Sequence, residues 1–401
     1  MANPGSRLLT GLTDDDAFRR GVQAWLANAL PTDWRTRLQG ATEEDVNRFQ
    51  LWWLEERRKV GLATPHWPRE WGGPGLPFSR QIIAYEEMAR ADAPELELML
   101  ISLFHLPATL FDAGTQEQRD LYLSGVRDGN DVWCQGFSEP GAGSDLASIR
   151  TTAARDADHY VVNGQKTWSS YAMYADYCLL LVRTDPHAAR KHDGLSLFIL
   201  DMRSPGVTVR PIRQITGEGE FAEIFLDDVI IPASNRIGAE NRGWAIAQST
   251  LSSERGLLLL SYAERVWQGY RKLSQVTRPS WLSDVGLRRE FASFHAELLT
   301  VRLMIGRLLS MTEESEEGRL ATLPVYIKLY WAPLLQRYTE FLVRAGGLVD
   351  QEWQPPVACT GHSSGVPALD FLKSFSWTIS GGSNEIMRNI VAERFLGLPR
   401  A

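Results

Sequence analysis

The chain has 401 residues, more than one compact core usually holds, so two or three domains are expected. Its net charge of −7 and the lack of any Lys/Arg-rich run argue against a nucleic-acid surface. The three cysteines and seven histidines lie scattered, without zinc-ligand or disulfide spacing, so we expect no metal site. No secretory signal and no apolar run long enough for a membrane span is present, which predicts a cytoplasmic protein that does not enter a membrane.

Residues 1–131 are predicted to form an N-terminal helical domain. Apolar residues recur there at helical spacing, as at Trp52 and Trp53 and again at Ile82 and Ile83. The breaker-rich string PHWPREWGGPGLP between these two helices indicates a loop.

Residues 132–235 switch to short alternating runs with turn signals between them, which predict strands. HYVVNGQKTW contains Asn163-Gly164, a pair that favours a tight turn between two strands. YCLLLVRT, LSLFILDM, VTVRPI and FAEIFLDDVIIP are further strand candidates. This zone is expected to be a small β-barrel or sandwich.

Residues 236–401 return to long helical patterns, and the segment from Gln351 to Gly365 is expected to be an exposed excursion. Four helices are predicted, and they suggest an antiparallel four-helix bundle. They cover Trp244 to Ser274, Val285 to Glu313, Leu323 to Ala345, and Asn384 to Phe395. The predicted fold class is therefore α+β and multidomain, in the order helices, β domain, helical bundle.

The string GFSEPGAGSDLAS, from Gly136 to Ser148, is the strongest motif. It places small and hydroxyl residues in a Gly-rich turn, where backbone amides can approach a ligand closely. The string resembles the first signature of the acyl-CoA dehydrogenase family almost letter for letter. Further similarity lies in GQKTWSSYAMYADYCLLLVRT and in SWTISGGSNEIMRNIVAERFLGLPR, so the resemblance runs from about residue 14 to Leu398.

The resemblance implies a bacterial FAD-dependent dehydrogenase that desaturates the α,β bond of an acyl thioester. Trp168 falls where the family places a Trp beside the flavin ring, and Ser170 where it places a hydroxyl near N5. Ser144 is also implied to contact the thioester head. The full set of implied FAD contacts is Phe137, Ser138, Gly143, Ser144, Trp168, Ser170, Ser383 and Glu385.

The family's reaction needs a carboxylate that removes the α-proton and donors that hold the thioester carbonyl. Many members carry the base where this chain has Gly381, which can offer only its backbone N–H to the carbonyl. A minority place a Glu before an Arg on the first bundle helix, and the string LSSERG supplies Glu254 and Arg255 there. Glu254 is thus the candidate base, and a surface ion pair is the alternative. Arg255 resembles an Arg that positions the CoA portion, with a helix-face salt bridge as its alternative.

The lack of a side chain at Gly381 would widen the pocket, which favours a branched, cyclic or otherwise bulky acyl group. In many members an RxxFG stretch reaches the FAD of a neighbouring subunit, whereas this chain has QVTRPSWLSDVG, with Arg278 as a possible substitute. The implied partners are an acyl-CoA or an acyl carrier protein thioester, electron-transfer flavoprotein, and a second copy in a homodimer or homotetramer. Two alternatives stay open: a flavin oxidase or monooxygenase of the same fold, and a non-catalytic subunit of a heteromeric dehydrogenase.

Overall fold

The structure is a computed structural model, and it describes residues 9, 11–12, 14–253, 257–276, 280–313, 323–347, 357–361 and 363–399. The chain divides into two compact units. We call residues 69–72 and 96–254 the sheet unit, and residues 1–68, 73–95 and 255–401 the helical unit. The three-part division at residues 131 and 235 remains a prediction.

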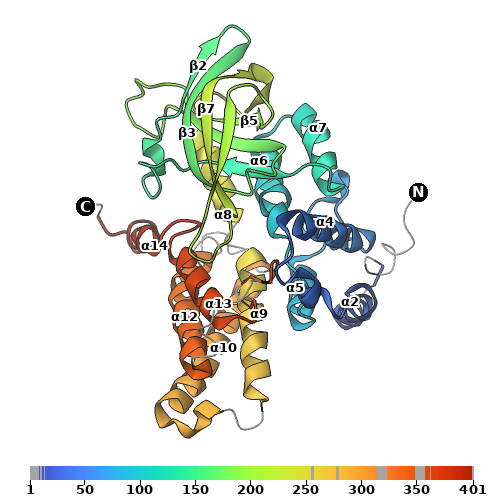
Figure 1. Cartoon of the computed structure of the whole chain (residues 1–401). Coiled ribbons are helices and arrows are strands. Elements are labelled where there is room, and N and C mark those ends of the chain that lie inside the picture. Colours follow the sequence, from blue (N-terminus) through green and yellow to red (C-terminus); the bar gives the residue numbers. More distant parts are fainter. Residues whose placement is uncertain are drawn as a thin grey trace. The chain divides into compact units, whose positions relative to one another are not determined.

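The sheet unit is built on one eight-stranded mixed sheet (Figure 1). The strand order is β6-β7-β3-β2-β4-β5-β8, with β1 pairing alongside β4 in parallel. The strands are β1 (Trp133–Gly136), β2 (Thr152–Asp156), β3 (His159–Ser170), β4 (Tyr177–Arg183), β5 (Leu195–Asp201), β6 (Val207–Ile212), β7 (Phe221–Pro232) and β8 (Arg236–Ile237). The predicted β domain is therefore present.

The sheet curls around an apolar core. Tyr160 on β3 and Phe198 on β5 are separated by two strands in the sheet order, yet their ring centroids lie 4.7 Å apart at 65°. Both side chains are fully buried, together with Val162, Leu180 and Ile224 from three strands. Alternation along each strand supplies the inward-facing residues of this core.

The prediction of a tight turn at Asn163-Gly164 is wrong. β3 runs through both residues, and the hairpin with β2 turns instead at Ala157 and Asp158. A Cβ on Gly164 would lie 2.5 Å from the Thr151 hydroxyl oxygen, so the glycine serves a close approach of two segments. Asn163 exchanges two 2.9 Å hydrogen bonds with Asp228, where β7 carries an extra residue.

Helices complete the sheet unit. They include a π-helical turn (Ile101–His105), α6 (Leu106–Ala113), α7 (Gln116–Arg127) and α8 (Gly243–Ser253). α6 contacts α8, and the Thr109 and Thr250 hydroxyls form a buried 2.7 Å hydrogen bond between them. α7 begins with a capping box of Thr115 and Gln118.

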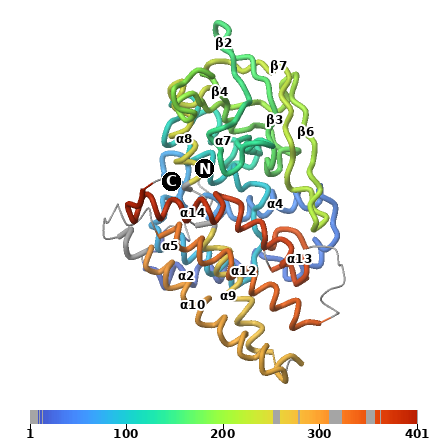
Figure 2. The backbone as a smooth tube through the Cα atoms, turned by 90° about the vertical axis from the view of Figure 1, so that its left-hand side faces the viewer, coloured from blue at the N-terminus to red at the C-terminus, as the bar shows by residue number. Residues whose placement is uncertain are grey.

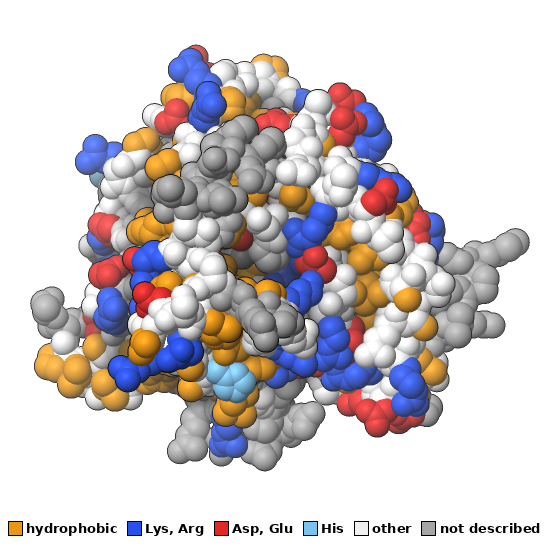
Figure 3. Space-filling model, turned by 60° about the horizontal axis from the view of Figure 1, so that its bottom comes forward, with side chains coloured by type: hydrophobic (Ala, Val, Ile, Leu, Met, Phe, Trp, Pro, Cys, Tyr) orange, Lys and Arg blue, Asp and Glu red, His pale blue; other side chains and the backbone are white. Residues whose placement is uncertain are grey.

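The helical unit contains the predicted N-terminal helices and the C-terminal helical region. Its α-helices are α2 (Asp15–Ala29), α3 (Trp34–Leu38), α4 (Glu43–Lys59), α5 (Phe78–Arg90), α9 (Leu257–Ser274), α10 (Val285–Glu313), α12 (Leu323–Gly346), α13 (Pro367–Ser374) and α14 (Asn384–Ile390). α10 contacts both α9 and α12, α5 packs on α9, and α13 packs on α12 (Figure 2). Surface ion pairs join α10 to α12. On the face of the molecule that Figure 3 shows, basic side chains lie beside acidic ones.

The fourth predicted helix covers its expected range, because α14 ends at Ile390 and continues as a π-helical turn, Val391–Phe395. Another expectation for the C-terminal region needs correction. The part of the expected exposed excursion that the structure describes is mostly buried: Cys359 and Thr360 are only 1% and 2% exposed, although Gly365 at its end is exposed. The Cys359 carbonyl accepts a 2.8 Å hydrogen bond from the Glu95 N–H, which ties this segment to the residues that follow α5. None of the described helices combines the length and apolarity that a membrane span requires.

Candidate functional site

The Gly-rich loop follows directly from β1. Phe137 is buried and Ser138 half-buried, and then Glu139 and Ala142 exchange two backbone hydrogen bonds of 3.0 and 3.1 Å that close a tight turn. Gly143 and Ser144 beyond the turn are exposed. A Cβ placed on Gly141 or Gly143 would meet nothing within 4 Å, so open space lies directly in front of this backbone. The loop can therefore accept a ligand against its main chain.

The end of β3 presents Trp168 in an unusual conformation. Its φ is +60°, a left-handed value that is uncommon for a bulky side chain. Between Lys166 and Ser169, β3 carries one residue more than β7 opposite it, which is a β-bulge. The indole is 58% exposed and makes an edge contact with Phe221 at 5.9 Å between centroids. Bulges and left-handed residues of this kind often lie at functional sites.

A backbone hydrogen bond joins the loop to the bulge, because the Thr167 N–H donates to the Ser138 carbonyl at 2.9 Å. Phe137, Ser138 and Trp168 therefore belong to one local structure, and the half-buried Ser170 ends the same strand. Gly143 and Ser144 continue the loop beyond its turn. The structure thus gathers all six predicted FAD contacts of the sheet unit on two adjoining segments.

A buried ion pair lies beneath this loop. Lys166 is fully buried on β3, and its Nζ donates to a Glu139 carboxylate oxygen at 2.8 Å and to the Phe137 carbonyl at 3.1 Å. The Glu139 carboxylate also accepts the N–H groups of Arg150 and Thr151, at 2.6 and 2.9 Å. The pair therefore fastens β3, the Gly-rich loop and the start of β2 to one another.

The pair keeps its charges at neutral pH. Burial lowers the pKa of Lys166 to about 8, and the nearby charge of Glu139 opposes that effect. Burial acts to raise the pKa of Glu139, but the charge of Lys166 and the hydrogen bonds from Lys166, Thr151 and Arg150 outweigh it and hold the pKa below its usual value.

Sequence reasoning missed Glu139 and Lys166, although both lie inside the quoted motifs. The alternation of β3 gave no signal, because Gly164 and Trp168, two positions to either side of the buried Lys166, are both exposed. Burial of Lys166 is what requires a partner for its charge. The acidic residue of the Gly-rich string was the nearest candidate.

The two glycines of the C-terminal turn lie in the helical unit. Gly381 and Gly382 have φ values of +60° and +91°, which glycine adopts without steric cost. Ser383 caps α14 by accepting the Ile386 N–H at 3.3 Å. Glu385 is exposed and pairs with Arg388 at 3.2 Å. Glu254, Arg255 and Arg278 lie outside the described residues, so their predicted roles stay predictions.

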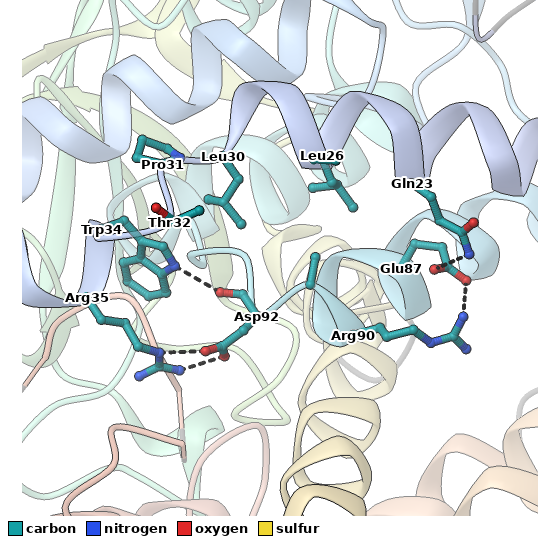
Figure 4. Close-up of a pocket in the computed structure, with 12 residues that line it drawn as sticks. Gln23, Leu26, Leu30, Pro31, Thr32, Trp34, Arg35, Glu87, Arg90 and Asp92 are labelled. Atoms are coloured by element: carbon teal, nitrogen blue, oxygen red, sulfur yellow. Dashed lines mark hydrogen bonds and ion pairs between the residues drawn. The ribbon is translucent and has the colours of Figure 1, made fainter.

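A surface cavity of about 490 Å³ lies elsewhere in the helical unit, between the C-terminal ends of α2 and α5 and the start of α3 (Figure 4). Arg35 forms a bidentate pair with Asp92, with both hydrogen bonds at 2.6 Å, and Arg90 pairs with Glu87 at 2.8 Å. Its lining includes none of the predicted site residues. We therefore place the candidate site at the loop and bulge.

The residues of the sheet unit fit FAD as the resemblance describes it. An exposed indole can flank a planar ring, and the open Gly141 and Gly143 backbone offers N–H groups to polar or anionic groups. Ser138, Ser144 and Ser170 supply hydroxyls on the same two segments.

Comparison with known proteins gives consistent matches. The family models "Acyl-CoA dehydrogenase, N-terminal domain" and "Acyl-CoA dehydrogenase, middle domain" match residues 13–130 and 134–229. The acyl-CoA dehydrogenase IpdE1 of Mycobacterium tuberculosis is 36% identical over 396 residues, which cover 97% of this chain and 99% of that protein.

Two solved structures are also similar. A protein described as "Tcur3481-Tcur3483 steroid ACAD" is 29% identical with a TM-score of 0.81, over 96% of this chain and 98% of that one. The ChsE4-ChsE5 complex from Mycobacterium tuberculosis contains a chain that is 28% identical with a TM-score of 0.79, again over 96% and 98%. The chain therefore belongs to the acyl-CoA dehydrogenase family of oxidoreductases.

Proposed function

We propose that this chain binds FAD and desaturates the α,β bond of an acyl thioester with a bulky acyl group. Family membership sets the reaction class. The observation that carries the cofactor assignment is the exposed Trp168 on its bulge, held beside the open Gly-rich loop by the Thr167–Ser138 hydrogen bond. FAD, when bound, supplies the acceptor for the β-hydride.

We assign the remaining tasks to residues of this chain. Glu254 takes the α-proton, since Gly381 has no side chain that could accept one. The Gly381 N–H donates to the thioester carbonyl, where negative charge develops as the α-proton leaves. Arg255 and Ser144 contact the CoA portion and the thioester head, and Ser383 and Glu385 complete the FAD contacts.

The proposal of a bulky acyl group has two supports. Gly381 and Gly382 leave the C-terminal turn without side chains, which gives space on the acyl side. The similar solved structure described as a steroid ACAD supports a fused-ring acyl group of that kind. A branched aliphatic group is the simpler variant, and the substrate panel below separates the two.

We further propose that electrons pass to electron-transfer flavoprotein and that the active form is an oligomer. The similar ChsE4-ChsE5 structure is a complex of two different chains, so a heteromeric assembly is a specific second candidate beside the predicted homodimer or homotetramer. The departure from the RxxFG stretch in QVTRPSWLSDVG also favours a partner that completes FAD binding.

The test is an anaerobic visible spectrum of the purified protein before and after addition of straight-chain, branched and steroid side-chain acyl-CoAs. We expect a yellow protein that a ring-containing acyl-CoA bleaches faster than straight-chain ones. Bleaching by straight-chain acyl-CoAs alone would overturn the bulky-substrate assignment. If only an acyl carrier protein thioester bleaches the yellow protein, the substrate is carried by acyl carrier protein and not by coenzyme A. Rapid reoxidation of the bleached protein by air would favour the oxidase alternative.

A colourless protein that takes up no FAD alone or with a candidate partner chain would overturn the cofactor assignment. FAD uptake only on mixing with such a partner would identify the heteromer.

A further inference from the structure

A buried lysine lies behind the Gly381 turn. Lys328 is on α12, in the middle of the C-terminal helical region, and only 4% of it is exposed. A buried ammonium group costs free energy unless polar groups surround it. Its Nζ donates hydrogen bonds to the backbone carbonyls of Ser380 and Gly382, which flank Gly381 on both sides.

The turn itself has little intrinsic rigidity. Gly381 and Gly382 both have left-handed φ values, and two successive glycines can reach many other conformations at little cost. An anchor from outside the turn is therefore needed to keep one conformation. Lys328 supplies it with two charge-assisted hydrogen bonds from a separate helix.

The geometry of the peptide bond gives this anchor a direction. None of the peptide bonds among the described residues is cis, so the C=O and the N–H of each such peptide plane point in opposite directions. The Ser380 carbonyl and the Gly381 N–H share one plane. Because the carbonyl points at Lys328, the Gly381 N–H points away from α12.

The charge of Lys328 also polarises the peptide group formed by the Ser380 carbonyl and the Gly381 N–H. A cation bound to a carbonyl oxygen draws electron density from the amide, and hydrogen bonds in a chain strengthen one another. The Gly381 N–H becomes a stronger donor toward an oxygen on its far side. A carbonyl that gains negative charge in the reaction benefits most from such a donor.

We infer that Lys328 is a positioning residue, which aims and polarises the Gly381 amide for the thioester carbonyl. The inference rests on the proposed function, in which that amide holds the carbonyl. Lys328 does not itself touch the substrate. Its hydrogen bonds restrict the backbone of the turn, which a side chain at position 381 would otherwise do.

The test compares two ligands that differ only in the carbonyl oxygen. One is the 2-enoyl-CoA of the acyl group that bleaches the protein best, and the other is the S-(2-alkenyl)-CoA thioether of the same carbon skeleton. Wild-type protein is expected to bind the thioester more tightly. Lys328→Met should reduce that preference about tenfold and lower kcat about 10- to 100-fold, with a smaller change in KM.

The second variant is Lys328→Arg, which keeps the charge and can reach both carbonyls. It should recover part of the preference, and it keeps the test open if Lys328→Met fails to fold. A merely structural lysine would predict equal losses for thioester and thioether, and that result would overturn the inference.

Failure of the proposed function gives a different outcome. In that case the wild-type protein itself shows no preference for the thioester. If the wild-type protein prefers the thioester and both variants keep that preference in full, only the role of Lys328 is refuted.

Discussion

Lys166 and Glu139 form a buried ion pair directly beneath the Gly-rich loop, with 2.8 Å between Nζ and the carboxylate oxygen. The pair joins residues that are 27 positions apart, and its two members also hold the Phe137 carbonyl and the N–H groups of residues 150 and 151. A buried pair of this kind gives little net stability over apolar residues, but it is costly to break. It therefore fixes the loop in one position relative to β3.

Lys166→Met should strongly destabilise the protein. The substitution leaves the Glu139 carboxylate buried without its cation, and the free energy of unfolding should fall by about 3–5 kcal/mol. Urea unfolding at pH 7, followed by tryptophan fluorescence, measures the change. The double variant Lys166→Met/Glu139→Gln should recover part of the loss, because no uncompensated charge remains.

A matched control is available on the same loop. Lys191 pairs with Asp145 at 2.5 Å, but both side chains are about half exposed. Lys191→Met should change the free energy of unfolding by less than about 1 kcal/mol. Equal effects of Lys166→Met and Lys191→Met would refute the role assigned to the buried pair.

Much of the fold could be predicted from periodicity. α10 runs from Val285 to Glu313, as its apolar pattern predicts, and the strand candidates VTVRPI and FAEIFLDDVIIP coincide with β6 and β7. Errors arose where tertiary contacts override local preference. Gly164 lies within β3 at a position where Thr151 leaves no room for a side chain, and the Cys359 carbonyl accepts a hydrogen bond from the Glu95 N–H, which is distant in the sequence.

The site could be predicted only as a set of residue types. Motifs placed Trp168 beside the Gly-rich loop, but no pattern indicated its left-handed φ or the extra residue in β3. Both depend on how β3 pairs with β7, which begins 51 positions after the end of β3. Lys328 escaped notice for a similar reason, since its partners are main-chain carbonyls on a distant turn that carry no sequence signal.

Asp370→Asn should stabilise the protein above about pH 6 and have little effect near pH 4. Burial raises the pKa of Asp370 from 3.8 to about 6, against the opposing effects of the hydrogen bonds from Ser364 and the charges of Lys373 and Arg35. The folded state therefore binds more protons than the unfolded state between these pH values, and stability falls as pH rises through them. Above about pH 6 the buried Asp370 carboxylate is ionised, and it lowers the free energy of unfolding by roughly 1–3 kcal/mol.

Urea unfolding of wild type and Asp370→Asn at pH 8 and pH 4 measures this difference. The Asn oxygen can still accept the 3.1 Å hydrogen bond from the Ser364 N–H, so the substitution changes charge with little change of shape. A difference of the same size at both pH values would show that ionisation of Asp370 is not its cause.

Trp168→Ala should weaken FAD binding about 3- to 10-fold, because an aromatic ring contact typically contributes 0.5–1.5 kcal/mol. Stability should change by less than about 1 kcal/mol, since the indole is mostly exposed. Fluorescence titration of the apoprotein with FAD gives the affinity. Trp52→Ala removes another exposed indole, in the helical unit, and should leave the FAD affinity unchanged.

Trp168→Gly separates the effect of losing the indole ring from the effect of backbone strain at this position. It loses the same indole, so FAD affinity should match that of Trp168→Ala. Glycine suits a φ of +60°, however, and this variant should be about 1 kcal/mol more stable than the alanine variant. Equal stability of the two would argue against strain at this position.

Glu254→Gln tests the proposed base. Gln keeps the size and hydrogen-bonding capacity of Glu but cannot take a proton, so kcat should fall about 10²–10⁴-fold while FAD content and enoyl-CoA affinity stay near wild type. Stopped-flow reduction of the bound flavin by the selected acyl-CoA measures the step directly. Loss of FAD together with activity would indicate a structural role for Glu254. Reduction at the wild-type rate would show that another carboxylate removes the α-proton, and the search would then turn to acidic residues contributed by a partner chain.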